Sequence, residues 1–251
     1  METYRNDLIG VDLRNMTMSE IVTKDFNAVT VFEKYNLDFC CGGDKSVSEA
    51  CDKEGLDALA VINEIQTLET KGKYTEKYSD WSLDFLTDYI VNNHHSYVRR
   101  MIPVLAAHTQ KIASVHGKNH PELIQVADRF ERVYKDLKQH MMKEEQILFP
   151  FVKQMVNAKK NSGNAEAPFF GTVKNPIRMM EAEHQAAGDE MHEIRNLTDN
   201  YSIPDDACDT YRAAMLELKD FEADLHKHVY LENYILFPDA VDLEQELLAH
   251  N

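Results

Sequence analysis

The chain has 251 residues, of which 27 are Lys or Arg and 43 are Asp or Glu, so its formal net charge at pH 7 is −16. Such an acidic surface repels phosphate backbones and anionic lipids, which argues against nucleic acid or a membrane as a partner. The amino-terminal residues lack an apolar core of signal-peptide length, and no window reaches the roughly 18 apolar residues of a membrane span. We therefore expect a cytoplasmic protein.

The first part of the chain predicts a small helical domain. Glycine and proline are scarce, at 9 and 7 residues, and apolar residues recur at helical spacing without sustained alternation, which indicates an all-α fold. The expected elements are a helix over residues 19–35, a turn over 38–45, a helix opened by a Ser46–Glu49 capping box and closed by Gly55, and a helix over 56–69.

A polar, aperiodic stretch over residues 69–80 predicts a domain boundary. We expect a small amino-terminal domain over residues 1–72, a linker over 73–80 and a second domain over 81–251. Four longer helical segments are predicted in the second domain, over residues 81–115, 121–156, 176–198 and from about 204 past Phe237. Their lengths and their short, long and short connections predict an up-down-up-down four-helix bundle.

One motif occurs twice, as HMMKEEQILFP at residues 140–150 and HVYLENYILFP at residues 228–238. Residues four apart share a helix face, so His140 projects beside Glu144, and His228 beside Glu232. The apolar ILFP run must face a core, which fixes the same helix rotation in both copies. The glutamates therefore lie on or beside the buried stripe, where a carboxylate costs several kcal/mol unless a cation or a proton compensates it.

Two more histidines follow the same doubling. His95 precedes His140 by 45 residues and His184 precedes His228 by 44, so each half supplies one histidine and then an HxxxE pair in the same order. Helical periodicity alone leaves His94 open as an alternative, whereas the repeat spacing favours His95. We expect four further histidines on the surface or just outside the ligands: His94, His116, His120 and His192.

Four histidines and two glutamates are too many ligands for one closed tetrahedral zinc, so the set predicts a dinuclear site. Imidazole and carboxylate without thiolate suit iron, manganese or zinc, and the type of bundle favours two non-haem iron ions. If Glu144 and Glu232 bridge, each ion receives two histidines and two carboxylate oxygens, and an oxo or hydroxo bridge would supply a fifth ligand.

The doubled motif, together with YNLDFCCGG at residues 35–43, resembles the repair of iron centres family of di-iron proteins. The resemblance covers nearly the whole chain and implies an ScdA-type amino-terminal domain with a Cys-Cys motif, followed by a hemerythrin-like bundle. It also implies that iron is bound by His95, His140, His184 and His228, and that Glu144 and Glu232 supply bridging carboxylates.

Members of this family are associated with the recovery of iron–sulfur proteins damaged by nitric oxide or peroxide. The resemblance implies damaged iron–sulfur proteins as recipients, and either iron donation or nitric oxide reductase activity at the di-iron pair, or both. Oxygen-carrying hemerythrins usually have a second histidine four residues after the one on the third helix, where this chain has Gly188. The alternative function is a hemerythrin-like sensor that binds dioxygen or nitric oxide. The sequence leaves open whether two chains form a homodimer.

The four cysteines do not predict a disulfide framework. Cys40 and Cys41 are adjacent, and a bond between neighbours strains the backbone, so we expect reduced thiols. Two glycines follow them in a predicted turn, where a thiolate could be stabilised, which suggests redox exchange or transient metal transfer. Simple packing of the two thiols would give the same pattern. Cys51 and Cys208 are expected to be packing residues.

Overall fold

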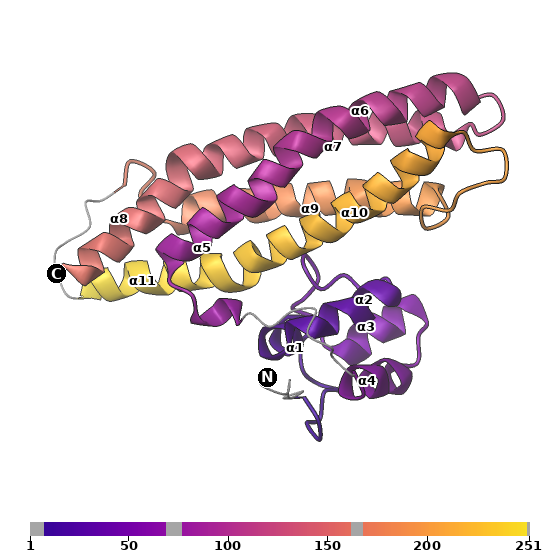
Figure 1. Cartoon of the computed structure of the whole chain (residues 1–251). Coiled ribbons are helices and arrows are strands. Elements are labelled where there is room, and N and C mark those ends of the chain that lie inside the picture. The colour runs from indigo at the N-terminus through magenta and orange to yellow at the C-terminus, as the bar shows by residue number, and fades with distance from the viewer. Residues whose placement is uncertain (1–7, 69–76, 162–167, 250–251) are drawn as a thin grey trace, which may run out of the picture. The chain divides into compact units, whose positions relative to one another are not determined.

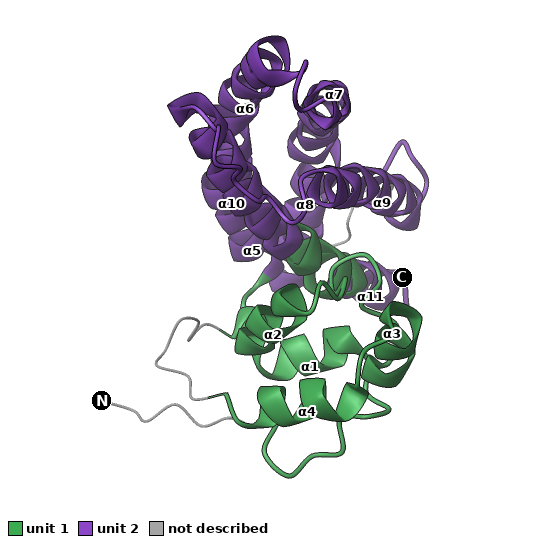
Figure 2. Ribbon diagram, turned by 90° about the vertical axis from the view of Figure 1, so that its right-hand side faces the viewer, with its two compact units in different colours: residues 1–82, 229–238 green, residues 83–228, 239–251 purple. Residues whose placement is uncertain are grey.

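The computed structural model describes residues 8–68, 77–161 and 168–249. Within these residues the protein is helical and has no strand, only an isolated bridge between Thr17 and Ser46, so the all-α prediction is confirmed (Figure 1). The chain divides into two compact units (Figure 2). Unit 1 comprises Met1–Ser82 and Val229–Pro238, and unit 2 comprises Leu83–His228 and Asp239–Asn251. Among the described residues, no helix is both long and apolar enough to cross a membrane.

Unit 1 begins with two short helices where one long helix was expected. The helix α1 covers Met18–Lys24 and α2 covers Val29–Lys34. Between them Asp25 is extended, with φ −148° and ψ 100°, and its carboxylate accepts hydrogen bonds from the backbone and the side-chain amide of Asn27. The prediction of a continuous helix over 19–35 is therefore wrong, because the aspartate caps a new 3-10 turn at Phe26–Ala28 instead of continuing the first helix.

The next helices of unit 1 follow their predicted signals. The helix α3, Val47–Glu54, opens with the expected capping box and ends at Gly55, whose φ of 67° suits glycine. The helix α4 covers Ala58–Gln66. Of the expected linker over 73–80, only residues 77–80 are described, and Tyr78–Asp80 form a 3-10 turn there.

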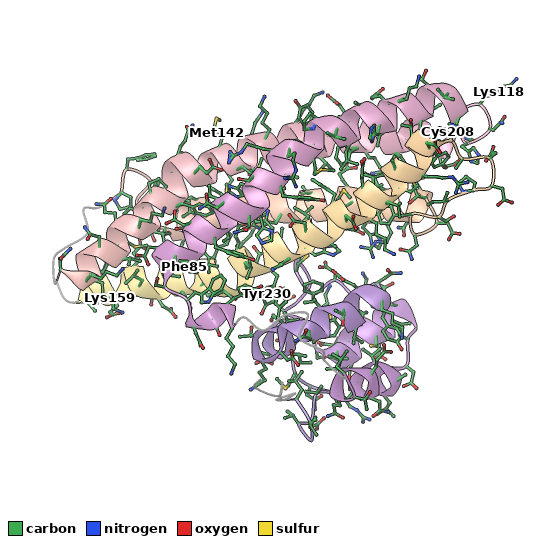
Figure 3. The ribbon with its side chains drawn as sticks, in the orientation of Figure 1. Phe85, Lys118, Met142, Lys159, Cys208 and Tyr230 are labelled. Atoms are coloured by element: carbon green, nitrogen blue, oxygen red, sulfur yellow. The ribbon has the colours of Figure 1, made fainter. Side chains whose placement is uncertain are left out.

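The core of unit 1 includes Tyr230, which is fully buried and is labelled in Figure 3. Its ring lies edge-on to Phe26, with centroids 5.5 Å apart, and its hydroxyl shares a 2.7 Å hydrogen bond with the hydroxyl of Thr23. Phe39 also approaches the ring, at a centroid distance of 6.1 Å. The stretch Val229–Pro238, which contains most of the second motif copy, thus packs into one core with the amino-terminal helices.

The four long helical segments described after residue 82 run side by side in Figure 1. Three of the four are interrupted by one wide π turn each. In chain order the segments are α5 Leu83–Ile90, a π turn Val91–His95 and α6 Ser96–His116; α7 Glu122–Lys143, a π turn Glu144–Leu148 and α8 Phe149–Lys160; α9 Lys174–Leu197; and α10 Asp209–Leu231, a π turn Glu232–Leu236 and α11 Phe237–Ala249. These bounds lie close to the predicted segments. The last helix starts later than expected because Ala207 N–H closes a turn on Pro204 O, at 3.1 Å.

The doubled motif explains two of the π turns. In the first copy the Phe149 N–H donates to the carbonyl of Glu144, five residues earlier, and in the second copy Phe237 does the same to Glu232. The next residue, Pro150 in the first copy, has no N–H, and its ring would clash with the carbonyl four residues back in a regular helix. The ILFP run is therefore both an apolar anchor and a signal for a widened turn that begins at a predicted ligand.

Candidate metal centre

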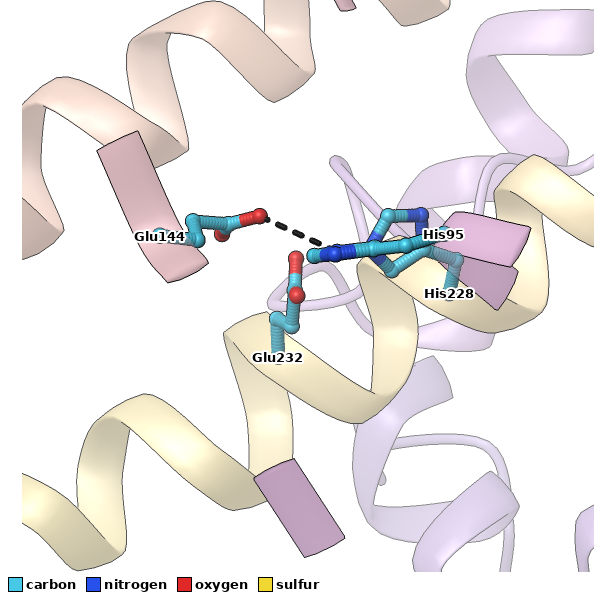
Figure 4. A group of neighbouring side chains, drawn as sticks. All are labelled: His95, Glu144, His228 and Glu232. Carbon is cyan, nitrogen blue, oxygen red and sulfur yellow. Dashed lines mark ion pairs between the residues drawn. The ribbon is translucent and has the colours of Figure 1, made fainter. Parts of the chain in front are cut away.

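The six predicted ligands lie together in two overlapping groups. One group is His95, Glu144, His228 and Glu232, and the other is His140, Glu144, His184 and Glu232. Within each group the candidate ligand atoms lie within 4.8 Å of one another, and all six residues are at most 1% exposed. Both glutamates belong to both groups, so the arrangement suits two cations that share two carboxylates. Figure 4 shows the first group.

Each long helix contributes to this cluster. His95 ends the first π turn, whereas Glu144 and Glu232 each begin one. His140 and His228 lie one turn before these glutamates, and the remaining histidine lies on α9. The π turns therefore coincide with the ligand positions, as π turns often do at functional sites.

The carboxylate of Glu144 faces both groups. Its Oε2 lies 3.3 Å from Nε2 of His95 and 3.3 Å from Nε2 of His140. First-row metal ions bind such nitrogen and oxygen atoms at about 2.1 Å, so an ion fits between atoms at this separation with an angle of about 100°. In the second group, Nε2 of His184 lies 3.0 Å from Nε2 of His140, and both nitrogens are directed at the same region.

The outer nitrogens of two histidines are held by carboxylates. His95 Nδ1 lies 2.7 Å from Glu145 Oε1, and His140 Nδ1 lies 2.9 Å from Glu183 Oε2. The hydrogen bond with His140 holds the pKa of the Glu183 carboxyl below its usual range, despite partial burial. Each carboxylate accepts a hydrogen bond from Nδ1–H, so a neutral ring has its lone pair on Nε2, directed at Glu144. Lone pairs that face a carboxylate favour a cation between them.

Each of these outer carboxylates also contacts a basic side chain. Glu145 Oε1 lies 2.5 Å from Nη2 of Arg99, and Glu183 forms an ion pair with Lys143. Sequence reasoning missed both glutamates. The available signal was adjacency, because each directly neighbours a predicted ligand in the chain.

His94 lies just outside both groups. It is 3% exposed, its Nδ1 lies 2.9 Å from Asp224 Oδ1, and its ring stacks on His228 with centroids 5.6 Å apart. Burial lowers the pKa of His94. The structure thus brings His95 into the cluster and leaves His94 beside it, in contact with a ligand ring.

The other three histidines predicted outside the ligand set also lie in unit 2. His192 is exposed, and His116 and His120 are half-buried. Cys208 was expected to pack in the core, and this prediction is wrong. Cys208 is exposed, before the start of α10 (Figure 3). Its sulfur lies 3.2 Å from His116 Nε2. The sequence placed it on a helix, but its segment is the turn that precedes that helix.

The remaining cysteines belong to unit 1, and all are free thiols. Cys51 is fully buried in α3, as expected for a packing residue. Cys40 is buried and Cys41 is half-buried, and their sulfur atoms lie 3.8 Å apart. The Cys-Cys pair is thus partly accessible from solvent through its second member.

Comparison with known proteins finds one family model that matches the first part of the chain and another that matches the second part. Residues 14–69 match the ScdA_N family model, described as a domain of unknown function (DUF542), and residues 86–240 match the hemerythrin HHE cation binding domain. Similar curated proteins carry the name iron-sulfur cluster repair protein YtfE, in Yersinia pseudotuberculosis serotype IB (strain PB1/+) and Yersinia pestis (strains Pestoides F and Angola). Each is 32% identical over 231 residues, which cover 92% of this chain and 99% of the relative.

The side chains of the candidate site are of the types that bind transition-metal ions, as the name of the second family model leads one to expect. Six buried imidazole and carboxylate side chains, arranged so that both carboxylates serve two ion positions, are compatible with a di-iron centre.

Proposed function

This chain belongs to the repair of iron centres family, in which an ScdA-type domain precedes a hemerythrin HHE domain, and we propose that it repairs iron–sulfur clusters damaged by nitrosative or oxidative stress. In this proposal residues 1–72 form the ScdA-type domain, 73–80 the linker and 81–251 the di-iron bundle of a cytoplasmic protein. His95, His140, His184 and His228 would hold two non-haem irons, and Glu144 and Glu232 would bridge them.

The observation that carries the proposal is the position of the Glu144 carboxylate, 3.3 Å from the Nε2 atoms of two histidines that belong to different groups. When bound, the iron pair would supply exchangeable iron and a redox centre for nitric oxide or dioxygen. The protein's own part is to exclude water by burial and to aim the imidazole lone pairs inward through Glu145 and Glu183.

Iron donation and nitric oxide reduction are the two finer mechanisms within this proposal. The helix α9 offers His184 to the cluster, and four residues later it has Gly188 in place of a further imidazole. Six side chains do not saturate two six-coordinate ions, which supports both access by small ligands and release of iron. Nitric oxide reductase activity uses the same openings and remains part of the proposal.

Iron analysis of the purified full chain tests the site first. We expect about two irons per chain, and loss of both in Glu144→Gln and Glu232→Gln variants. The function is then tested with a [4Fe–4S] hydratase that has lost one iron to peroxide. Recovery of its activity, in step with iron lost from the loaded protein, supports donation. Catalytic consumption of nitric oxide without iron loss supports reduction instead. An iron-free or zinc-only native protein overturns both.

A sensor of dioxygen or nitric oxide is the second candidate, favoured by one feature of unit 1. Tyr230 and Asn233 flank Glu232 on the same stretch of helix, and they contact Thr23 and the carbonyl of Cys40. A shift of the bridging carboxylate would therefore reach the amino-terminal helices directly. Stoichiometric nitric oxide binding that changes protease cleavage in residues 8–68, with neither turnover nor iron transfer, would make sensing the better account.

A further inference from the structure

Unit 1 contains another group of candidate metal ligands, Asp38, Cys40 and Cys41, whose ligand atoms lie within 4.8 Å of one another. The two sulfurs are 3.8 Å apart, and the Cys40 sulfur lies 3.3 Å from Asp38 Oδ1. Two thiolates that bind a tetrahedral ion at about 2.3 Å are held about 3.8 Å apart, and a sulfur and an oxygen about 3.5 Å apart. These two separations therefore match a single small cation, and the third pair of ligand atoms lies within 4.8 Å.

We infer that Asp38, Cys40 and Cys41 form a second, mononuclear binding site for a divalent transition-metal ion, separate from the dinuclear cluster. Soft thiolate ligands beside one carboxylate select ions such as Fe²⁺, Co²⁺ or Zn²⁺ over Mg²⁺ or Ca²⁺. Asp38 is exposed and Cys41 is half-buried, so the ion can enter from solvent and water can complete its coordination.

The backbone holds this loop in a fixed shape. Asp38 Oδ1 accepts hydrogen bonds from the N–H groups of Cys40 and Cys41, at 3.1 and 2.8 Å. A β-carbon on Gly43 would lie 2.2 Å from the carbonyl oxygen of Phe39 and 3.0 Å from the Tyr234 ring, so only glycine fits there. The three donors are thus positioned before an ion arrives.

A side chain from the second motif copy also supports the loop. Asn233 Nδ2 donates to the carbonyl of Cys40 at 3.0 Å. Because Asn233 directly follows Glu232, the thiol site and one bridging carboxylate are attached to the same π turn. A role for the thiol site as a station for iron in transit rests on the proposed repair function, whereas the site itself does not.

The same geometry argues against two other uses of the thiols. A disulfide needs its sulfurs at about 2.05 Å, and a bond between adjacent cysteines is strained, whereas these sulfurs are 3.8 Å apart. A hydrogen bond with Cys41 and burial raise the pKa of the Cys40 thiol well above its ordinary value, so it is a weak nucleophile when no metal is bound. A cation displaces the two thiol protons to solvent and forms two metal–sulfur bonds without any redox change.

Cobalt titration of the full-length, iron-loaded protein under anaerobic conditions tests this site. Thiolate-to-cobalt charge transfer gives a near-ultraviolet band, which is measured as the difference from the same iron-loaded protein before cobalt is added, because an iron pair also absorbs in this region. We expect the band to saturate at about one Co²⁺ per chain, with release of about two protons. It should be absent in Cys40→Ser and Cys41→Ser and unchanged in the matched control Cys208→Ser, which removes an exposed thiol of unit 2.

The variant Asp38→Asn isolates the carboxylate, because the amide oxygen can still accept the two backbone hydrogen bonds. We expect Co²⁺ affinity to fall at least about tenfold, the loss typical even of an outer partner of a ligand. Iron content, measured in parallel, should stay at the wild-type value in Cys40→Ser, which separates this site from the dinuclear centre. Absence of the band in the wild-type protein, its persistence without Cys40, or unchanged affinity in Asp38→Asn overturns the inference.

Discussion

The replacement Glu145→Gln tests how the protein aims its histidines. Glu145 Oε1 lies 2.7 Å from His95 Nδ1, and the amide oxygen of glutamine can still accept a hydrogen bond from Nδ1–H but carries no charge. Loss of such an outer partner costs about 10–100-fold in metal affinity, which is about 1.4–2.7 kcal/mol. The partner Arg99 is 47% exposed, so its lost ion pair adds little. We therefore expect this substitution to weaken the ion held by the His95 and His228 group.

The matched replacement Glu183→Gln acts on the other group. Glu183 Oε2 lies 2.9 Å from His140 Nδ1, so this variant should weaken the ion bound by His140 and His184 by a similar factor. Competition with a ferrous chelator should give biphasic iron release in each variant, with one iron lost early. Mössbauer spectra of partly depleted samples should show that the early iron differs between the two. The control Glu131→Gln removes only a surface pair with Lys135 and should match the wild type.

Parallel, single-phase loss of both irons in the two variants would refute the division into two groups. Unchanged release in both would refute the argument that Glu145 and Glu183 set the basicity of the ligands. The variants should fold, because both glutamates are partly exposed and glutamine occupies the same volume.

Three further outcomes follow from the contacts. Pro150→Ala supplies the missing N–H, so the π turn can relax to a regular helix. We expect iron affinity to fall at least about tenfold, while the helical circular dichroism stays unchanged. Unchanged iron affinity would contradict this role for the proline. Removal of iron with a chelator should lower the free energy of unfolding in urea of the wild-type protein by about 2.7 kcal/mol, compared with the protein in free iron at 100 times the dissociation constant. The chelator should have no such effect on Glu144→Gln. Tyr230→Phe should cost about 1 kcal/mol in urea unfolding. Thr23→Val also removes a hydrogen bond to the Ser19 carbonyl, so the double variant should lose less than the sum of the two single losses; additive losses would exclude the Thr23–Tyr230 hydrogen bond as the cause.

The sequence was most informative where chemistry imposes a periodic pattern. Two HxxxE pairs, each followed by the same apolar run, predicted both the helix face and its burial, and the structure brings these residues together with His95 and His184. Long helices were also predictable, because their apolar stripes are continuous over many turns. Their observed bounds mostly differ from the expected ones by a few residues.

Local competition between signals was harder to predict. Asp25 fits within a helical pattern, but its carboxylate caps the following turn and breaks the helix, which periodicity cannot detect. The π turns are hidden for a similar reason, because one extra residue per turn leaves the apolar run intact. Pro150 is the visible signal, because its ring and missing N–H disfavour a regular helical turn at this point.

The two motif copies show why packing partners cannot be derived from one copy. Their inward positions keep the same histidine and glutamate, because both copies face the same pair of ion positions. Their outward positions diverge. Met142 is 51% exposed, whereas its counterpart Tyr230 is fully buried in the core of unit 1. Glu145 supports a ligand ring, and its counterpart Asn233 instead supports the loop of the paired cysteines.

That divergence is itself a readable signal. A repeat that keeps its inward residues while it exchanges an exposed methionine for a tyrosine, and a glutamate for an asparagine, has acquired a neighbour on one copy only. The loss of charge and the gain of an aromatic ring are both expected when a helix face becomes buried. Comparison of the outward positions could therefore have identified residues 229–238 as the part of the helix that joins the amino-terminal core.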